Sequence, residues 1–200
     1  MGDIGTNVYF LMNVESKEML IFDPADSPEE IEEKVREMGG KPVAVLLTHG
    51  HHDHIGAAEE VRAKYKIPIY CDAAEEDLLA DSYKNLSGSW TGKGISLTAD
   101  ETLIDGQEAD LAGFHFKALH TPGHTAGSCC YYFPEEKLLF SGDTLFRLSY
   151  GRTDLPTGND ADIEASVRRI LTEIPSDVRV LPGHMGETKI AVEKAYNPLA

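Results

Sequence analysis

Residues 48–56, with the sequence Thr-His-Gly-His-His-Asp-His-Ile-Gly, constrain this chain more than any other segment. Four histidines and one aspartate lie there, directly after the short apolar run of residues 43–47. Imidazoles and carboxylates this close together cost desolvation and repel one another, unless a cation binds them. Because a short all-apolar run is typical of a buried strand, the segment predicts a metal site in the loop at the end of that strand.

Three single residues farther along the chain share this setting. His124, Asp143 and His184 each follow an apolar run, in the contexts Thr-Pro-Gly-His, Ser-Gly-Asp-Thr and Leu-Pro-Gly-His. Each of them, taken alone, could be a cap or turn residue. Together with the histidine-rich segment they supply about enough ligands for two metal ions.

Spacing predicts which residues bind the first ion. His49 and His51 lie on either side of a glycine, which lets the backbone turn tightly, so both imidazoles can reach one ion. His124 would complete this site.

A second ion would take the neighbouring pair Asp53 and His54, which can point to a different side, together with His184. Asp143 has two carboxylate oxygens and is suited to bridge the two ions. Such a pair, about 3.5–4 Å apart, lowers the pKa of bound water toward about 7 and so gives a hydroxide nucleophile at neutral pH. We expect Asp53 and Asp143 to hold that hydroxide in place, which makes them the candidate catalytic residues.

Four other polar residues are candidates for supporting positions. His52, His115 and His120 are interpreted as surface groups or as groups that contact a ligand rather than the metal. Asp23, at the end of an apolar strand and before a proline, is either a cap or a group that orients a ligand histidine.

The charge balance limits the partners of the chain. Lys and Arg number 18 and Asp and Glu number 34, which gives a formal charge of −16. With no basic surface available, we expect no binding to nucleic acid or to an anionic membrane, and a small-molecule substrate instead. No apolar run approaches the roughly 18 residues of a spanning helix.

The three cysteines, Cys71, Cys129 and Cys130, are an odd number without framework spacing. In a chain whose N-terminus lacks the features of a signal peptide, they predict free thiols and a cytoplasmic location. Cys129 and Cys130 are adjacent and would point to opposite faces of a strand. The oligomeric state stays open between monomer and homodimer.

The chain alternates between strands, loops that carry a ligand, and helices, which predicts one α/β domain over residues 1–200 with its site on the loops at strand ends. The expected strands are residues 8–14, 18–22, 43–47, 67–70, 114–119, 128–133, 138–140 and 178–181. The expected helices are residues 27–38, 57–66, 72–79, 163–174 and 187–195. Residues 82–94 are expected to form a mobile loop over the site, and residues 145–158 another loop.

The run His49-Gly-His-His-Asp-His54, followed by His124, Asp143 and His184, resembles the signature of the metallo-β-lactamase superfamily. The resemblance covers essentially the whole chain. It implies a four-layer αββα sandwich with metals at the edge between two sheets, and the same division of the seven ligands between two ions.

Within that superfamily the chain resembles the small glyoxalase II-like hydrolases, which are hydroxyacylglutathione hydrolases. Residues 48–51, 119–127, 141–146 and 151–156 carry this resemblance. It implies a metal-dependent thioesterase. Glyoxalase II proper has a further C-terminal helical region that helps to hold glutathione, and none is expected here. Class B lactamases typically have cysteine where Asp143 stands, so antibiotic hydrolysis is not expected.

Arg152 and Tyr150 are the candidate substrate-binding residues. Arg152 stands where glyoxalase II enzymes place a lysine that holds a substrate carboxylate, and a guanidinium can bind such a group through two hydrogen bonds. Tyr150 could line the same pocket. The alternative for Arg152 is an ion pair with Asp154 that only shapes the loop.

Other functions remain open. Persulfide dioxygenases, which this chain also resembles in Gly151-Arg-Thr-Asp154, use one iron held by residues that correspond to His49, His124 and Asp143. A lactone or other ester hydrolase of the same fold, or a non-catalytic metal-binding domain, would also fit. The ligands suit zinc, iron and manganese, and zinc is the metal that we expect.

Overall fold

Five strands of the N-terminal half form one mixed sheet in the order β1-β2-β3-β4-β5. The structure, a computed structural model, describes residues 1–2 and 4–200. The first pair of strands is antiparallel and the others are parallel. The strands are β1 Tyr9–Met12, β2 Glu18–Phe22, β3 Lys41–Leu46, β4 Ile69–Asp72 and β5 Glu101–Leu103.

A second sheet has six strands in the order β13-β12-β9-β8-β7-β6. β12 and β9 are parallel, and the other neighbours are antiparallel. A two-stranded hairpin, β10 with β11, follows β9 along the chain. These strands are β6 Glu108–Leu111, β7 Phe114–His120, β8 Cys129–Phe133, β9 Leu138–Gly142, β10 Leu145–Phe146, β11 Ser149–Tyr150, β12 Arg179–Pro182 and β13 Thr188–Lys189.

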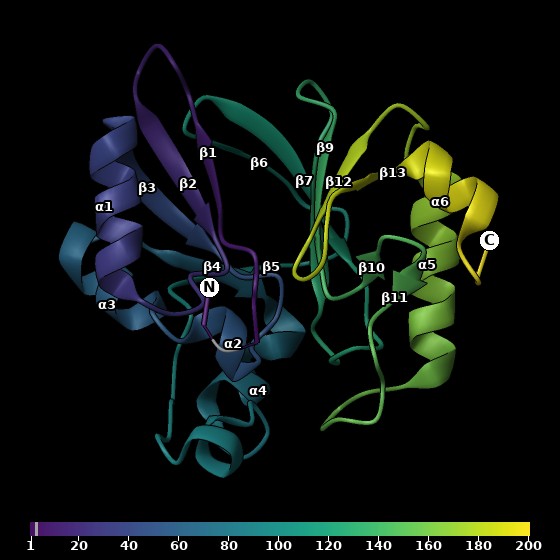
Figure 1. Ribbon diagram of the computed structural model, residues 1–200, viewed down its shortest axis with the longest axis horizontal. Helices are drawn as coiled ribbons and strands as arrows, with labels where there is room; N and C mark the ends of the chain where they lie inside the picture. The colour runs from purple at the N-terminus through teal and green to yellow at the C-terminus, as the bar shows by residue number, and fades with distance from the viewer. Residues whose placement is uncertain (3) are drawn as a thin grey trace.

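Helices cover the outer faces of both sheets, so the molecule has the layers helix, sheet, sheet, helix (Figure 1). α1 and α3 lie on the first sheet, and α5 and α6 lie on the second. The predicted four-layer αββα sandwich is therefore confirmed. The helices are α1 Pro28–Met38, α2 His52–Ile55, α3 Ala58–Tyr65, α4 Glu76–Ala80, α5 Asp160–Glu173 and α6 Ile190–Tyr196, with a 3-10 turn η1 Ala73–Glu75 and a π-helical turn η2 Ser87–Thr91.

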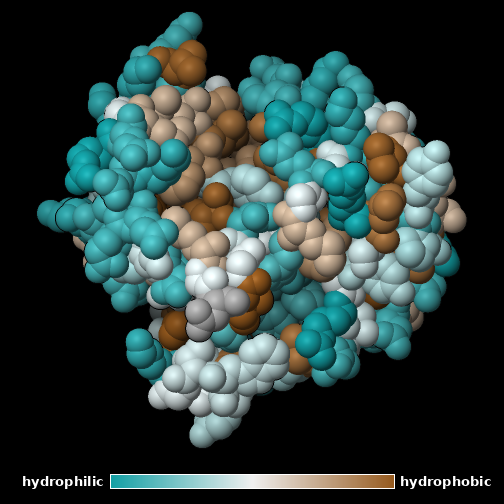
Figure 2. Space-filling model, viewed as in Figure 1, coloured by the Kyte–Doolittle hydropathy of each residue, from teal (hydrophilic) through white to brown (hydrophobic). Residues whose placement is uncertain are grey.

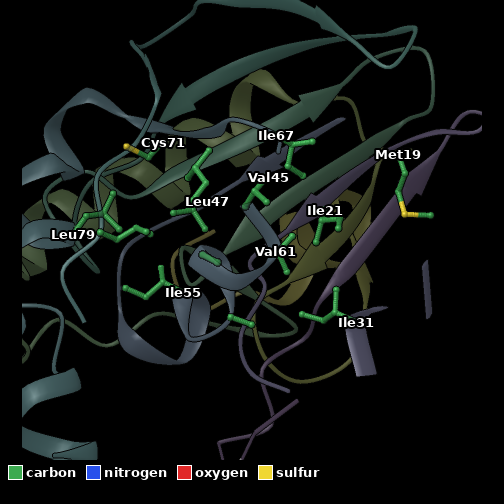
Figure 3. Close-up of a cluster of buried hydrophobic side chains, with 14 of the residues drawn as sticks. Met19, Ile21, Ile31, Val45, Leu47, Ile55, Val61, Ile67, Cys71 and Leu79 are labelled. Carbon is green, nitrogen blue, oxygen red and sulfur yellow. The ribbon is translucent and has the colours of Figure 1, made fainter. Parts of the chain in front are cut away.

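Alternating side chains on the strands produce these layers. On β2, Met19 and Ile21 face α1 and α3 (Figure 3), whereas Leu20 and Phe22 face the second sheet. Because successive side chains of a strand point to opposite faces, a strand that is apolar at every position is buried on both sides.

Aromatic side chains fill the space between the sheets. Phe22 and Phe140 stack with ring centroids 3.7 Å apart, and Tyr131 and Phe133 pack edge-on against Phe22. All four are almost completely buried. Figure 2 shows hydrophilic side chains over much of the face viewed, with smaller hydrophobic patches among them.

The predicted cysteine chemistry agrees with the structure. All three cysteines are free and buried. Cys129 faces the core between the sheets and Cys130 faces the core beneath α5, on opposite sides of β8 as predicted.

The sequence predicted most elements within a few residues of their observed bounds, but several differ. The strands β5, β6 and β13 were not predicted, β13 lies within the expected helix of residues 187–195, and the expected loop of residues 145–158 contains the β10–β11 hairpin. α5 begins at Asp160 rather than 163, because the Asn159 side chain accepts hydrogen bonds from the first-turn amides of Ala161 and Asp162. Ser27 precedes α1 as predicted but forms no side-chain cap.

No helix among residues 1–2 and 4–200 is long and apolar enough to cross a membrane. The assignment of residues 1–200 to one domain stays a prediction.

Asp72 and His120 connect the two sheets. Asp72 ends β4 and His120 ends β7, and Asp72 Oδ2 lies 3.0 Å from His120 Nδ1. The hydrogen bond to Asp72 raises the pKa of His120 above its ordinary value, although partial burial acts in the opposite direction. The resulting stabilisation is fully present below the unfolded pKa of about 6.5 and disappears as the pH rises through the folded pKa.

We therefore expect His120→Asn to lower the free energy of unfolding by about 0.5–1 kcal/mol near pH 6 and by less near pH 9. Urea unfolding at both pH values measures the difference. Asp72→Asn and the double variant complete a mutant cycle, in which the double variant should lose no more than the single ones. A loss that grows as the pH rises would contradict the assignment.

Candidate metal centre

The histidine-rich segment follows β3 and leads, through residues 47–51, into the short helix α2. At Gly50, between His49 and His51, two leucine side chains of α4 lie 2.8 Å from where a Cβ would stand. A glycine here therefore lets the segment pass close to α4. The predicted loop is correct for residues 48–51, whereas residues 52–55 are helical.

His49, His51 and His124 form the first group of facing donors. One ring nitrogen of each lies within 4.8 Å of the others, and His51 Nδ1 is 2.9 Å from His124 Nε2. All three side chains are buried. The structure thus brings together the three residues that were predicted for the first ion.

Asp53, His54 and His184 form the second group. His184 Nε2 lies 3.2 Å from Asp53 Oδ2 and 3.4 Å from His54 Nε2. His54 Nε2 is 3.7 Å from Asp53 Oδ2. Since His184 follows β12 and the other two lie in α2, this group connects the two sheets.

Asp143 lies between the groups, just after β9. Its Oδ2 atom is 3.6 Å from His124 Nε2 in the first group and 3.3 Å from His184 Nε2 in the second. Its Oδ1 atom is 3.4 Å from His54 Nε2. One carboxylate therefore faces donors from both groups, as predicted for a bridging ligand.

These separations suit cations. Four ligands at about 2.0–2.1 Å from a tetrahedral ion lie about 3.4 Å from one another. The His51–His124 separation and those among Asp53, His54 and His184 run from 2.9 to 3.7 Å, and the donor atoms of the first group all lie within 4.8 Å of one another. In the described part of the chain, His49 Nε2 and Asp143 Oδ1 are buried without a hydrogen-bond partner. Buried polar atoms rarely stay unpaired. A cation bound between His49 and Asp143 would give both of these atoms a partner.

Burial sets the protonation of the first group. It lowers the pKa of His49 well below the ordinary value, and the neighbouring His54 and His124 lower it further. Burial, followed by His124, lowers the pKa of His51 to about 3. Both imidazoles are therefore neutral at pH 7, which is the form that binds a cation.

Charge sets the protonation of the second group. Burial acts to lower the pKa of His54, but Asp143, Asp53 and Asp23 outweigh it and raise that pKa well above its ordinary value. Burial is likewise outweighed by Asp143 and Asp53 at His184, whose pKa rises to about 9. Without a cation these two imidazoles hold protons against the carboxylates, so an ion that binds here replaces the protons.

Asp23 fixes the start of the segment. Its Oδ1 atom accepts the Thr48 amide at 2.7 Å, and its Oδ2 atom accepts the Thr48 hydroxyl at 2.7 Å and lies 3.0 Å from His54 Nδ1. Of the two roles considered for Asp23, the geometry shows that it orients a ligand-type histidine. The other ring nitrogen of His54 is then free to face the second group.

Arg152 contributes a backbone atom to the centre. Its carbonyl oxygen lies 2.7 Å from His124 Nδ1, which leaves Nε2 facing the first group. Its guanidinium is exposed and forms two hydrogen bonds with Asp154, of 2.6 and 2.7 Å. The loop-shaping ion pair is thus present, and binding of a substrate anion by Arg152 stays a prediction. Tyr150 packs partly against the core beneath α5, so its predicted contact with substrate also stays a prediction.

Three histidines lie outside both groups, in line with the sequence interpretation. His52 packs edge-on against Trp90, with ring centroids 5.7 Å apart. His115 lies 3.1 Å from Asp110 on the exposed side of the second sheet, and His120 contacts Asp72.

Residues 82–94 are more ordered than the predicted loop. They contain η2, and the buried Asn85 donates hydrogen bonds to the carbonyls of Leu79 and Ile95. The carbonyl of Asn85 accepts the His52 amide at 2.8 Å, which ties the segment to the start of α2. Its mobility stays a prediction.

Sequence reasoning missed several supporting residues. Thr6 donates a hydrogen bond to Asp53, and the buried Glu75 carboxylate accepts the amides of Gly50 and Gly127. Glu75 gives no signal, because the chain has many acidic residues in helices. His124 and His184, in contrast, have a local signal, because each follows a glycine in the same Pro-Gly-His triplet.

Comparison with known proteins identifies the family. A sequence profile described as the metallo-β-lactamase superfamily matches residues 1–184. The chain belongs to the metallo-β-lactamase superfamily. A probable metallo-hydrolase, YqgX, of Bacillus subtilis is 42% identical over 99% of this chain and 93% of its own length. Hydroxyacylglutathione hydrolase GloC of Haemophilus influenzae is 31% identical over 92% of this chain and 88% of its own length.

Similar solved structures agree with the fold. The crystal structure of BLEG-1, a B3 metallo-β-lactamase, is 40% identical with a TM-score of 0.93, over 99% of this chain and 95% of that one. The crystal structure of TTHA1623 in a di-iron-bound form is 34% identical with a TM-score of 0.87, over 100% of this chain and 98% of that one. Membership of the superfamily, together with the cluster of histidines and aspartates, supports a metal-dependent hydrolase.

A substitution at Gly183 tests how tightly the metal centre is packed. A Cβ at this position would lie 2.2 Å from Asp143 Oδ1 and 2.6 Å from His54 Cε1. We expect Gly183→Ala to displace these side chains and to reduce the bound metal to at most one ion per chain, measured by elemental analysis after dialysis. Gly186→Ala in the same turn is the matched control, since no atom lies within 4 Å of its Cβ. Full metal content in Gly183→Ala would show that the turn is not so tightly packed.

Proposed function

We propose that this chain is a dinuclear metal-dependent hydrolase that cleaves a small thioester or a related ester. The observation that carries the proposal is the position of Asp143 Oδ2, which lies 3.6 Å from His124 Nε2 and 3.3 Å from His184 Nε2. One carboxylate oxygen between two groups of three donors is the arrangement that bridges a pair of ions. The metal ligands in this proposal are His49, His51, Asp53, His54, His124, Asp143 and His184.

Divalent ions held by these residues would supply Lewis acidity toward the substrate carbonyl and would lower the pKa of a coordinated water. Nitrogen and carboxylate donors suit zinc, iron and manganese. We propose zinc. Iron is the alternative metal, and the di-iron-bound form of TTHA1623 supports this alternative.

The protein side chains keep the water in position. Asp53 is partly exposed, and among the described residues only its Oδ2 atom is engaged, by Thr6 and His184. Its Oδ1 atom can therefore accept a hydrogen bond from the attacking water. Thioester hydrolysis then adds the water oxygen to the carbonyl carbon, breaks the carbon–sulfur bond, and releases a carboxylic acid and a thiol.

The substrate assignment rests on relatives and on charge. The similarity to GloC favours a hydroxyacyl thioester of glutathione or of a comparable thiol. In an acidic protein, Arg152 is the proposed anchor for an anionic group of that substrate, with Tyr150 beside it. We propose a small-molecule substrate, with no nucleic-acid or membrane partner, and a cytoplasmic location that fits the three buried free thiols.

Hydrolysis of a β-lactam is a second candidate. The aspartate at position 143, where class B lactamases typically have cysteine, argues against β-lactam hydrolysis. The 40% sequence identity to BLEG-1, described as a B3 metallo-β-lactamase, favours testing this reaction. Both reactions add water to a carbonyl carbon, so the same centre could serve either one. The shape of the substrate pocket would then decide between them.

The purified protein should therefore release thiol from a hydroxyacylglutathione faster than it opens a chromogenic cephalosporin. Removal of the ions with a chelator should abolish both activities. Oxygen consumption with a persulfide, together with one iron per chain, would instead favour the mononuclear dioxygenase. Bound metal with no turnover of any thioester, lactone or β-lactam would favour a non-catalytic domain.

Asp143→Ala tests the bridging role. We expect the rate of thioester hydrolysis to fall by about 100-fold or more, because several kcal/mol of transition-state stabilisation depend on the ions that Asp143 positions. The fold should persist, as judged by circular dichroism. Asp110→Ala, which changes an exposed carboxylate on the second sheet, is the control and should keep the wild-type rate. A near-normal rate in Asp143→Ala with two ions bound would refute the role.

A further inference from the structure

The N-terminal segment before β1 reaches into the second group of donors. Thr6 is completely buried, and its hydroxyl donates a 2.8 Å hydrogen bond to Asp53 Oδ2. Figure 1 shows this segment entering beside α2 and beside the loop that follows β12. The contact connects residues 47 positions apart, so the local sequence around Asp53 does not predict it.

Asp53 Oδ2 is also the atom that faces the rest of the second group, since it lies 3.2 Å from His184 Nε2. A carboxylate oxygen has two lone pairs. The Thr6 hydroxyl occupies one of them and restricts rotation of the carboxylate, so that the other stays directed toward His184. Thr6 thereby selects the orientation of Asp53 in which that oxygen can bind an ion.

Asn7 fixes the backbone on both sides of His184. Its amide donates to the carbonyl of Gly183 at 2.8 Å. Its side-chain Nδ2 donates to the carbonyls of Pro182 and Met185, at 3.0 and 2.9 Å. Three hydrogen bonds from one residue therefore hold the turn that presents His184.

The first group is held by other parts of the chain. His124 Nδ1 contacts the carbonyl of Arg152 at 2.7 Å, and His49 Nδ1 lies 3.3 Å from the Thr48 hydroxyl. In the described part of the chain, neither Thr6 nor Asn7 forms a hydrogen bond with a residue of that group.

We propose that Thr6 and Asn7 are positioning residues that control occupancy of the second ion separately from the first. The inference rests on the proposed dinuclear function and adds to it a division of labour between the N-terminal segment and the rest of the chain. Loss of the Thr6 hydroxyl should weaken the second ion and leave the first in place. Contacts of this kind to ligating carboxylates typically change metal affinity by about 10–100-fold.

Metal-free protein titrated with Zn²⁺ against a competing chelator tests this proposal, with elemental analysis of the dialysed protein as a second readout. We expect the wild type to bind two ions. Thr6→Val should bind the first with unchanged affinity and the second at least about 10-fold more weakly. Thr6→Ser, which keeps the hydroxyl, should restore the second ion. Asn7→Ala should weaken the second ion in the same selective way, which keeps the test available if Thr6→Val folds poorly.

Thr188→Val is the matched control. It also removes a buried hydroxyl that donates to a carboxylate, in this case Glu193 Oε1 at 2.6 Å in α6. It should bind both ions as the wild type does. Unchanged second-ion affinity in Thr6→Val, or equal weakening of both ions, would overturn the inference while leaving the dinuclear proposal standing. A wild-type chain that binds one ion would overturn both.

Discussion

Mutual repulsion among buried imidazoles and carboxylates is the constraint on which this structure depends. Seven such side chains lie at the edge between two sheets, where their desolvation is costly unless cations and hydrogen bonds offset it. Asp143 is the centre of this arrangement, because its two oxygens face donors from both groups. Burial keeps His49 and His51 neutral, whereas the carboxylates keep protons on His54 and His184 until a cation replaces them.

The fold supports this cluster by bringing strand ends together. β3, β7, β9 and β12 each end at a loop that carries a ligand-type residue, and glycines at the crowded points let the loops approach. A Cβ at Gly151, for example, would lie 1.8 Å from the Asp143 carbonyl. Contacts on the side away from the centre then orient two of the rings: Asp23 orients His54, and the Arg152 carbonyl orients His124. The rigid aromatic core between the sheets carries these loops, so their geometry does not depend on the loops alone.

The sequence predicted which residues the fold brings together in the two groups and most of the strands and helices, and the layered sandwich followed from the resemblance to the superfamily. Dense histidines in residues 48–56 and the repeated Pro-Gly-His triplet are local signals, and the apolar runs showed where strands end. The contacts that orient the cluster were not predictable, because Thr6 meets Asp53 and Glu75 meets Gly127 only through the tertiary fold. The short strands β5 and β6 were missed because alternating exposed residues in an acidic stretch give them little apolar signal. Arg152 shows the same limit, since its backbone carbonyl, which carries no sequence signal, contacts His124.

Diffraction data collected on both sides of the absorption edge of the bound metal would show whether Asp143 lies between two ions. Two anomalous peaks are expected in crystals of the purified protein. One should lie among His49, His51 and His124, the other among Asp53, His54 and His184, with Asp143 between them. A single peak, or two peaks with Asp143 turned away from either one, would contradict it.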